Sequence, residues 1–164
     1  MTTASKAGSE APSEAGQCFS SGFHCSEAVL IAGAGALGRN VAEIIPSVAT
    51  AFGGGMRLGG PCGALTGALM TIGLAVGRRD PEDKGKKDLA ARLGPEFGAI
   101  FLKEFGHLTC HELTGHNPAV PEESTRWRAS NGRQTFCLPL VERTVDLLMA
   151  FLNENGLLDS TGKE

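Results

Sequence analysis

The stretch FGGGMRLGGPCGALTGALMTIGLAVG, residues 52–77, decides the fold that we expect for this chain. Five glycines precede Pro61, and glycine lets the backbone approach a neighbouring group closely. From Cys62 to Gly77 no residue is charged, and apolar side chains occur on every face of a helix drawn through this segment. A helix that is apolar all round is a buried one. We therefore predict a central core helix over residues 62–77, with Cys62 on its first turn.

Two other interpretations of this stretch stay open at this point. The uncharged run approaches the roughly 20 residues that a transmembrane helix needs, and Arg57 and Arg78 bound it. Alternatively, the glycines merely turn the chain and Cys62 is a small core residue, as free cysteines often are. The positions of the other cysteines have to decide between these interpretations and a functional site.

The composition restricts the fold class and the kind of partner. The chain has 164 residues, enough for one domain with its own core, and a net charge of −3 with both signs interspersed. No basic patch marks a nucleic-acid site, and only 5% of the residues are aromatic, which argues against an all-β sandwich. The N-terminus lacks the apolar segment of a signal peptide, so we expect a cytoplasmic protein. Cysteines in that compartment are more often metal-binding or redox-active than disulfide-bonded.

Helix signals recur along the chain and predict an all-α fold. Residues 1–11 are small and polar and are expected to be disordered, residues 12–158 form one helical domain, and residues 159–164 form a flexible tail. Apart from the central helix, we expect these segments to be helical: residues 12–20, 26–38, 40–51 with a break at Pro46, 80–93, 96–106 and 138–155. Residues 115–135 are expected to form a long connection with one helical turn near Trp127.

Local signals place several helix boundaries. Asp80 can cap a helix whose first turn holds Pro81, and Gly94-Pro95 is expected to break that helix. Gly156 can end the last helix. A 3-4-3-4 spacing of apolar residues predicts one inward face on this last helix: Leu138, Val141, Val145, Leu148 and Leu152.

One glycine motif imitates a dinucleotide-binding site. Gly33, Gly35 and Gly38 match G-x-G-x-x-G after an apolar segment. A dinucleotide site also needs an acidic residue about 20 positions later and a βαβ unit around the motif. No Asp or Glu occurs between Glu43 and Asp80. We therefore predict that the motif is helix, with Gly38 at the C-terminal cap.

Five cysteines are spread over the chain without any C-x-x-C pair, which removes the usual zinc-ribbon, thioredoxin and bacterial ferredoxin spacings. Four of them fall at expected helix N-termini: Cys25, Cys62, Cys110 and Cys137. Free N–H groups and the helix dipole stabilise thiolate there, and thiolate is both the nucleophile and the metal ligand. Cys18 lies outside this pattern and receives no role.

The four histidines are reserve ligands. His107 and His111 are four residues apart and could share a helix face with a metal, but that geometry fails if Cys110 starts a new helix. His24 and His116 lie at loop ends. We interpret each histidine as solvated or hydrogen-bonded unless the cysteines are insufficient as ligands.

At these residues the sequence resembles a known family, the C-GCAxxG-C-C family of small redox-active proteins from bacteria and archaea. The central motif is C-G-A-x-x-G at Cys62–Gly67, and the resemblance covers about residues 16–155. The other matching segments are GFHCSEAVL at Gly22–Leu30, FGGGM at Phe52–Met56, CHEL at Cys110–Leu113 and CLPLV at Cys137–Val141. Family members are similar to the C-terminal region of split-Soret cytochrome c, a mostly helical region whose cysteines are associated with an iron–sulfur cluster. No C-x-x-C-H occurs in this chain, so covalent haem is not expected.

The resemblance implies a redox protein that transfers electrons through an iron–sulfur cluster, most simply a [2Fe–2S] cluster. The cysteines that would hold this cluster are Cys25, Cys62, Cys110 and Cys137. The glycines that would let the backbone approach it are Gly54, Gly55, Gly60 and Gly63. A redox partner protein is then expected, with no nucleic acid and no membrane, and a homodimer stays open. The alternative is a structural or interaction protein in which the same thiols hold zinc or act as a thiol–disulfide switch.

Overall fold

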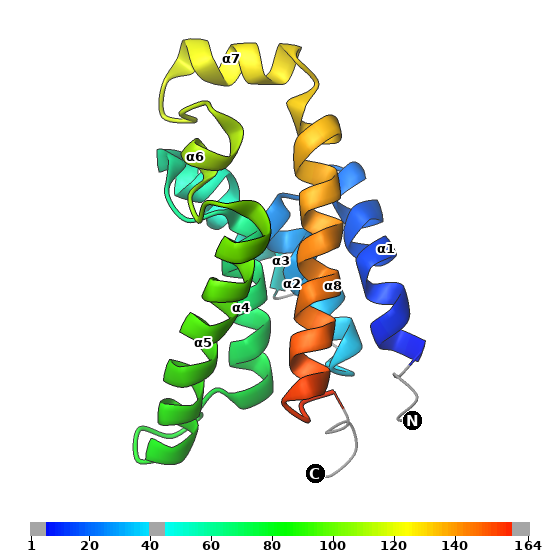
Figure 1. Ribbon diagram of the computed structural model, residues 1–164, viewed down its shortest axis with the longest axis vertical. Helices are drawn as coiled ribbons and strands as arrows, with labels where there is room; N and C mark the ends of the chain where they lie inside the picture. Colours follow the sequence, from blue (N-terminus) through cyan, green and yellow to red (C-terminus); the bar gives the residue numbers. More distant parts are fainter. Residues whose placement is uncertain (1–5, 40–44, 159–164) are drawn as a thin grey trace.

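Residues 6–39 and 45–158 are described by the computed structural model, and their regular secondary structure is helical (Figure 1). The helices are α1 (Lys6–Ser20), α2 (Cys25–Ala36), α3 (Ile45–Ala49), α4 (Gly63–Val76), α5 (Lys84–Phe105), α6 (Cys110–Thr114), α7 (Pro121–Ala129) and α8 (Leu138–Glu154). Short helical turns lie at Thr50–Phe52 (η1), Gly55–Gly59 (η2) and Arg133–Cys137 (η3). The predicted all-α fold is therefore confirmed for the described part of the chain.

Helix α4 is the central helix that the sequence predicts. It packs against α2, α5 and α8, and most of its residues are buried. Glycines let α2 and α4 approach closely: a Cβ atom at Gly67 would lie 2.6 Å from the carbonyl oxygen of Ser26. A Cβ atom at Gly33 of α2 would likewise collide with the side chain of Thr71. Nowhere in the described residues is a helix long and apolar enough to cross a membrane.

Helix α8 completes the core with the predicted apolar stripe. The stripe residues that are fully buried are Val141, Val145, Leu148 and Leu152. Leu138 is only partly buried. Phe151 of α8 makes an edge-to-face contact with Phe97 of α5, with ring centroids 5.5 Å apart. Burying one such aromatic side chain contributes roughly 1.5–3 kcal/mol, so these helices supply much of the stability of the fold.

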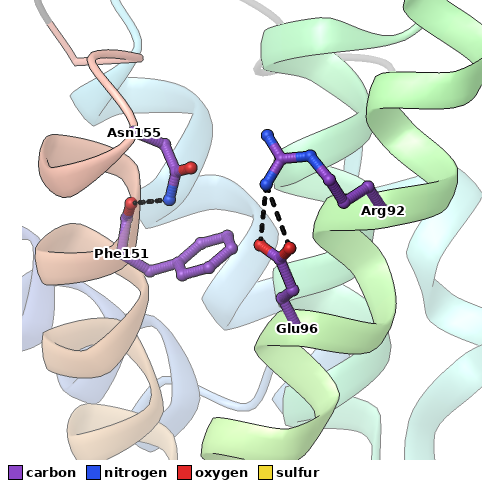
Figure 2. A network of polar contacts seen from close by, with 4 residues as sticks. All are labelled: Arg92, Glu96, Phe151 and Asn155. Carbon is purple, nitrogen blue, oxygen red and sulfur yellow. Dashed lines mark hydrogen bonds and ion pairs between the residues drawn. The ribbon is translucent and has the colours of Figure 1, made fainter.

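Polar contacts lie along α5 and at the end of α8 (Figure 2). Arg92 Nη1 donates to both carboxylate oxygens of Glu96, at 3.0 and 3.1 Å. Asn155 Nδ2 donates to the carbonyl oxygen of Phe151 at 2.9 Å. Gly156 then takes a left-handed conformation, with φ 67°, just after α8 ends. Exposed ion pairs such as the one in α5 contribute only about 0.2–1 kcal/mol, so the apolar core dominates.

The G-x-G-x-x-G motif lies at the end of α2 and is helical, as predicted. Gly33 and Gly35 are inside the helix, and Gly38 follows it with φ 65°. The N–H group of Gly38 donates to the carbonyl oxygen of Gly35 at 2.9 Å. The N–H group of Arg39 donates to the carbonyl oxygen of Ala34 at 2.9 Å. This bond completes the hydrogen-bond pattern of a helix that ends at a glycine. The motif therefore caps a helix and does not form a phosphate-binding turn.

Helix α1 is longer than the sequence predicts. It begins at Lys6 instead of residue 12, so the prediction of disorder is wrong for residues 6–11. This helix packs against α2 and α8 through a face of buried side chains: Ala11, Ala15 and Phe19. Tertiary burial stabilises helices more than local propensity does, which explains order in a small and polar segment. Residues 1–5 and 159–164 lie outside the described residues.

Helix α5 is continuous where the sequence predicts two helices. Asp83, instead of Asp80, caps it by accepting a hydrogen bond from the N–H group of Lys86 at 3.0 Å. Pro95 lies inside the helix and does not break it. The face on both sides of this proline is buried: Leu93, Phe97 and Phe101. The free energy of burying that face offsets the missing hydrogen bond of the proline.

Two connections also differ from the prediction. Residues 115–135 contain the nine-residue helix α7 instead of a single turn near Trp127. Three local signals favour this helix: Pro121 at its first position, acidic residues in its first turn and basic residues in its last turn. The helix expected around Pro46 is reduced to α3 and the turn η1, and residues 40–44 lie outside the described residues.

Three helices begin at the same end of the molecule. Helices α2, α4 and α8 start at the end where α1 and α5 finish and where α6 and α7 lie (Figure 1). We call this part, residues 22–25, 53–63 and 106–137, the cysteine end. The long helices α1, α2, α4, α5 and α8 outside these residues form the helical body. Helix N-termini carry partial positive charge, so this end of the fold favours anionic groups.

Candidate metal centre

Three of the four predicted cysteines line one cavity at the cysteine end. Cys25, Cys110 and Cys137 contribute to the wall of a space of about 280 Å³. Cys25 is the first residue of α2, Cys110 is the first residue of α6, and Cys137 directly precedes α8. These residues are far apart in sequence, so the packing of the helices brings their thiols to one place.

The backbone places Cys62 beside this cavity. Its N–H group donates to the carbonyl oxygen of Leu108 at 2.8 Å. The N–H group of Cys110 donates to the carbonyl oxygen of Gly60 at 2.7 Å. Pro61 and Thr109 between them form an isolated antiparallel bridge. The segments that carry Cys62 and Cys110 are thereby held side by side, although α5 separates them in the chain.

Two of the four predicted glycines, Gly54 and Gly63, lie next to the sulfur of Cys25. Gly54 borders the cavity and its N–H group donates to the sulfur of Cys25. A Cβ atom at Gly63 would collide with that sulfur. Gly55, with φ 60°, lies so close to Gly60 that a Cβ atom would collide with the Gly60 carbonyl oxygen. Glycine is required at these positions because the backbone approaches a sulfur atom or another backbone segment there.

Burial raises the pKa of all four thiols. The pKa of Cys110 rises to about 11 and that of Cys137 to about 12, and the pKa of Cys62 lies well above its ordinary value. Negative charge on Cys25 raises the pKa of the other three further. In the absence of a cation all four are neutral thiols near pH 7.

The hydrogen-bond donors around the sulfurs differ from one cysteine to the next. Backbone N–H groups of α2 and α4 reach the sulfurs of Cys25 and Cys62, as expected at helix N-termini. The hydroxyl of Thr114 donates to the carbonyl oxygen of Cys110 at 2.6 Å and lies near enough to the thiol to lower its pKa. Cys137 does not lie at a free helix N-terminus, because η3 and α8 form one continuous helical stretch across it. The N-terminus prediction is therefore wrong for Cys137, and burial by packed helices accounts for its position.

Cys18 and two histidines lie outside this cluster. Cys18 is in α1, and burial and the nearby carboxylate of Glu14 raise its pKa. Cys110 starts α6, so His107 precedes the helix and does not share a face with His111. His107 Nδ1 is 3.9 Å from a carboxylate oxygen of Glu112. A metal site that His107 and His111 would share on one helix face is therefore excluded, because Cys110 starts a new helix between them.

The other two histidines line the cavity together with residues that the sequence does not single out. His24 and His116 belong to its wall, and so do three arginines: Arg57, Arg128 and Arg133. The ring of His116 stacks on Trp127 with centroids 4.5 Å apart. These cations are scattered over the sequence and follow no motif. Only Arg57, inside the glycine loop, carries a local signal that could have drawn attention to it.

The donor set fits a group that is held by thiolates. Three thiols line one cavity with Cys62 beside it, and the missing side chain of Gly63 makes room for the sulfur of Cys25. Within residues 6–39 and 45–158, no three His, Cys, Asp or Glu side chains are already arranged as a finished metal centre. Rotation about the Cα–Cβ bond moves each sulfur, so the converging thiols can adjust to a metal. All five cysteines are free thiols in this structure.

Comparison with known proteins gives one match. Neither a search of the curated proteins nor a search of solved structures finds a similar chain. A family model described as "Putative redox-active protein (C_GCAxxG_C_C)" matches residues 23–151, which include the four clustered cysteines and exclude Cys18. This match covers most of the 164 residues. The chain therefore belongs to the C_GCAxxG_C_C family of redox-active proteins.

Proposed function

We propose that this protein transfers single electrons through an iron–sulfur cluster, a [2Fe–2S] cluster in the simplest case. The ligands are Cys25, Cys62, Cys110 and Cys137. The observation that carries this proposal is that three cysteines from separate segments line one cavity, while backbone hydrogen bonds hold Cys62 beside it. The family's redox activity supports it, since an iron–sulfur cluster is a redox group that four cysteines can hold.

When bound, such a cluster supplies reversible one-electron reduction. The residues of the chain hold and tune it. Backbone N–H groups at Cys25 and Cys62 donate to sulfur, and hydrogen bonds of this kind raise the reduction potential. Burial of Cys62, which is 7% exposed, keeps water away from one side of the site. The electrons come from and return to a redox partner protein, and we expect both in the cytoplasm.

The competing function is a structural or switching role for the same thiols. Zinc also accepts four cysteines, and two disulfides would make a thiol switch. Zinc is colourless and carries no electrons, whereas an iron–sulfur cluster absorbs visible light. Metal analysis and a visible spectrum of anaerobically purified protein therefore separate the three forms. We expect iron and acid-labile sulfide in equal amounts and visible absorption that dithionite bleaches.

Cys62→Ser tests the ligand set, and Cys18→Ser is the matched control. Serine is close in size to cysteine, but its hydroxyl is not ionised near neutral pH and is a poor ligand for iron. Cys62→Ser should lose the iron and the visible bands while circular dichroism keeps the helix content of the parent. Cys18→Ser should keep both, because α1 places that thiol outside the cavity.

Two results would contradict the proposal. Full iron content in Cys62→Ser together with loss of iron in Cys18→Ser would show that the ligand set is wrong. Stoichiometric zinc without iron, or quantitative disulfides under anaerobic conditions, would replace electron transfer by one of the competing functions.

A further inference from the structure

The wall of the cysteine cavity is cationic. Arg57, Arg128 and Arg133 line it together with His24 and His116. None of the described residues that form this wall is an Asp or a Glu. Arg57 and Arg128 are exposed, so the cavity presents a positive lining to solvent, and such a lining attracts an anion.

Arg57 is held in place by a strained backbone. Its φ is 60° and its ψ is 10°, and Met56 before it also has a φ of 60°. Residues other than glycine occupy this left-handed region at a cost of about 1–3 kcal/mol each, and such strain concentrates at ligand sites. The Arg57 Nη2 atom lies 3.4 Å from Nε2 of His24, which also lines the cavity. The strained turn η2 thus places a guanidinium group at the cavity.

The three arginines differ in how many of their N–H groups already donate to groups of the protein. Arg133 Nη2 donates to the carbonyl oxygens of Phe19 at 2.7 Å and Phe23 at 2.6 Å, so its position is structural. Among the ion pairs of the described residues, none involves Arg57 or Arg128. Guanidinium groups bind carboxylate and phosphate oxygens through two parallel hydrogen bonds. Arg57 and Arg128 are therefore the two groups with donors to offer to a ligand.

The nearest carboxylates have other partners. Glu27 accepts hydrogen bonds from the hydroxyl of Thr50 and from the N–H group of His24, both at 2.6 Å. Glu123 accepts a hydrogen bond from the N–H group of Asn117 at 2.6 Å. Neither carboxylate lines the cavity. They hold the loops around the site and leave the cationic lining without an internal counterion.

One buried polar atom in the wall also lacks a partner. His116 Nδ1 is buried and makes no hydrogen bond within the described residues. An unpaired buried nitrogen costs free energy unless a ligand or water meets it. His116 lies in the same wall as the arginines, but this nitrogen has no accessible surface, so the arginines carry the argument for an occupant with hydrogen-bonding oxygens.

We propose that the cavity binds a small oxyanion, held by Arg57 and Arg128 next to the thiols. The volume of about 280 Å³ is close to the lower end of the roughly 300–1,000 Å³ of pockets for drug-sized ligands, so we expect a small ligand. A planar carboxylate and a tetrahedral phosphate both satisfy two guanidinium groups. This inference deepens the proposed redox function, because it places an anionic ligand beside the redox site.

Trp127 reports binding directly. It is the single tryptophan of the chain and lines the cavity. We would titrate the full-length, metal-free chain with inorganic phosphate and with acetate at constant ionic strength, with sodium chloride as the reference. A saturable change in Trp127 fluorescence is expected for at least one oxyanion and not for chloride. The comparison of phosphate with acetate then assigns the geometry of the ligand.

Arg128→Gln and Arg126→Gln form a matched pair on α7. Both remove one positive charge, but only Arg128 lines the cysteine cavity, whereas Arg126 lines a neighbouring pocket that shares His116 and Trp127 with it. Arg128→Gln should weaken oxyanion binding about tenfold or more, as expected for losing a charge-assisted contact. Arg126→Gln should leave binding unchanged. Arg57→Gln serves as a second test at the other side of the site.

The outcomes separate this proposal from the proposed cluster. No saturation with either oxyanion, or equal weakening in Arg126→Gln and Arg128→Gln, would overturn the oxyanion site. Loss of iron in Arg57→Gln and Arg128→Gln with unchanged anion binding would overturn it too, because the arginines would then serve the cluster alone. If the purified protein holds no iron, the cluster proposal fails, but the metal-free titration still decides whether the oxyanion binds.

Discussion

The helical body and the cysteine end are built from different residues in different conformations. The body consists of long helices, up to the 22 residues of α5, and buries aliphatic and aromatic side chains. The cysteine end contains the five-residue α6, the nine-residue α7 and the left-handed turn η2, and it collects thiols, histidines and arginines. Apolar burial stabilises a fold, whereas left-handed backbone at residues other than glycine costs stability. The comparison indicates that the body supplies the stability that the cysteine end needs.

Removing a core ring from the body should have the largest effect on stability. Phe97 is fully buried and contacts Phe151. Phe97→Ala should lower the free energy of unfolding by about 3–5 kcal/mol, because it loses apolar burial and leaves a cavity. Urea denaturation followed by circular dichroism measures this loss. The iron content per folded chain should not change.

Leu102→Ala on the same helix is the control for that change. Leu102 is 44% exposed, so its loss should have a much smaller effect than that of Phe97. If Phe97→Ala removed the iron from chains that are still folded, the division between the body and the cysteine end would not hold.

Two glycines of α4, four residues apart, test the division between the helical body and the cysteine end within one helix. A Cβ atom at Gly67 meets the backbone of Ser26, which cannot rotate away, whereas one at Gly63 meets the movable sulfur of Cys25. Gly67→Ala should destabilise the fold by about 1–3 kcal/mol and leave the iron content of folded chains unchanged. Gly63→Ala should destabilise it less but reduce the iron content, because the displaced sulfur is a proposed ligand.

Denaturation midpoints and iron analysis of both glycine variants decide this test. The opposite pattern, with iron lost in Gly67→Ala and retained in Gly63→Ala, would place the site elsewhere on α4. Reduced stability without loss of iron in both variants would assign Gly63 a purely structural role.

The smallest effect on stability is expected from removing an exposed ion pair on the surface of the helical body. Arg143 Nε donates to Glu104 Oε1 at 2.7 Å and lowers the pKa of that carboxyl below its ordinary value of 4.5. A folded-state pKa below the unfolded one stabilises the fold above the unfolded pKa. This stability is lost as the pH falls through the folded pKa. Glu104→Gln should therefore lower the urea midpoint slightly at pH 7, and the difference from the parent should shrink below about pH 4.5.

A double-mutant cycle with Arg143→Gln isolates this contribution. Additive effects of the two substitutions at pH 7 would show that the contact contributes nothing, as is common for exposed ion pairs. A coupling that stays constant as the acid titrates would also contradict the assignment to Glu104.

Helices with a continuous apolar stripe could be predicted from the sequence. The last helix follows from the spacing of its apolar residues and the central helix from its uncharged, apolar sequence, because both are local properties that tertiary packing then uses. The glycine motif at Gly33–Gly38 could be assigned to a helix end for the same reason. The helix break expected at Pro95 is not observed. The ring of Phe97, two residues later, is buried against Phe151 of α8, and this contact between helices is not visible in the local sequence.

The four cysteines could be selected from the sequence, because each lies in a local motif near the start of a helix. Their convergence on one cavity depends on the packing of α2, α4, α6 and α8, and the cationic wall depends on residues as distant as Arg57 and Arg133. No periodicity links such residues, since helix patterns describe one segment at a time. The sequence by itself therefore determined the central and last helices and which thiols are candidate ligands. The tertiary structure alone decided which charges surround those thiols, because only packing brings distant segments within electrostatic range.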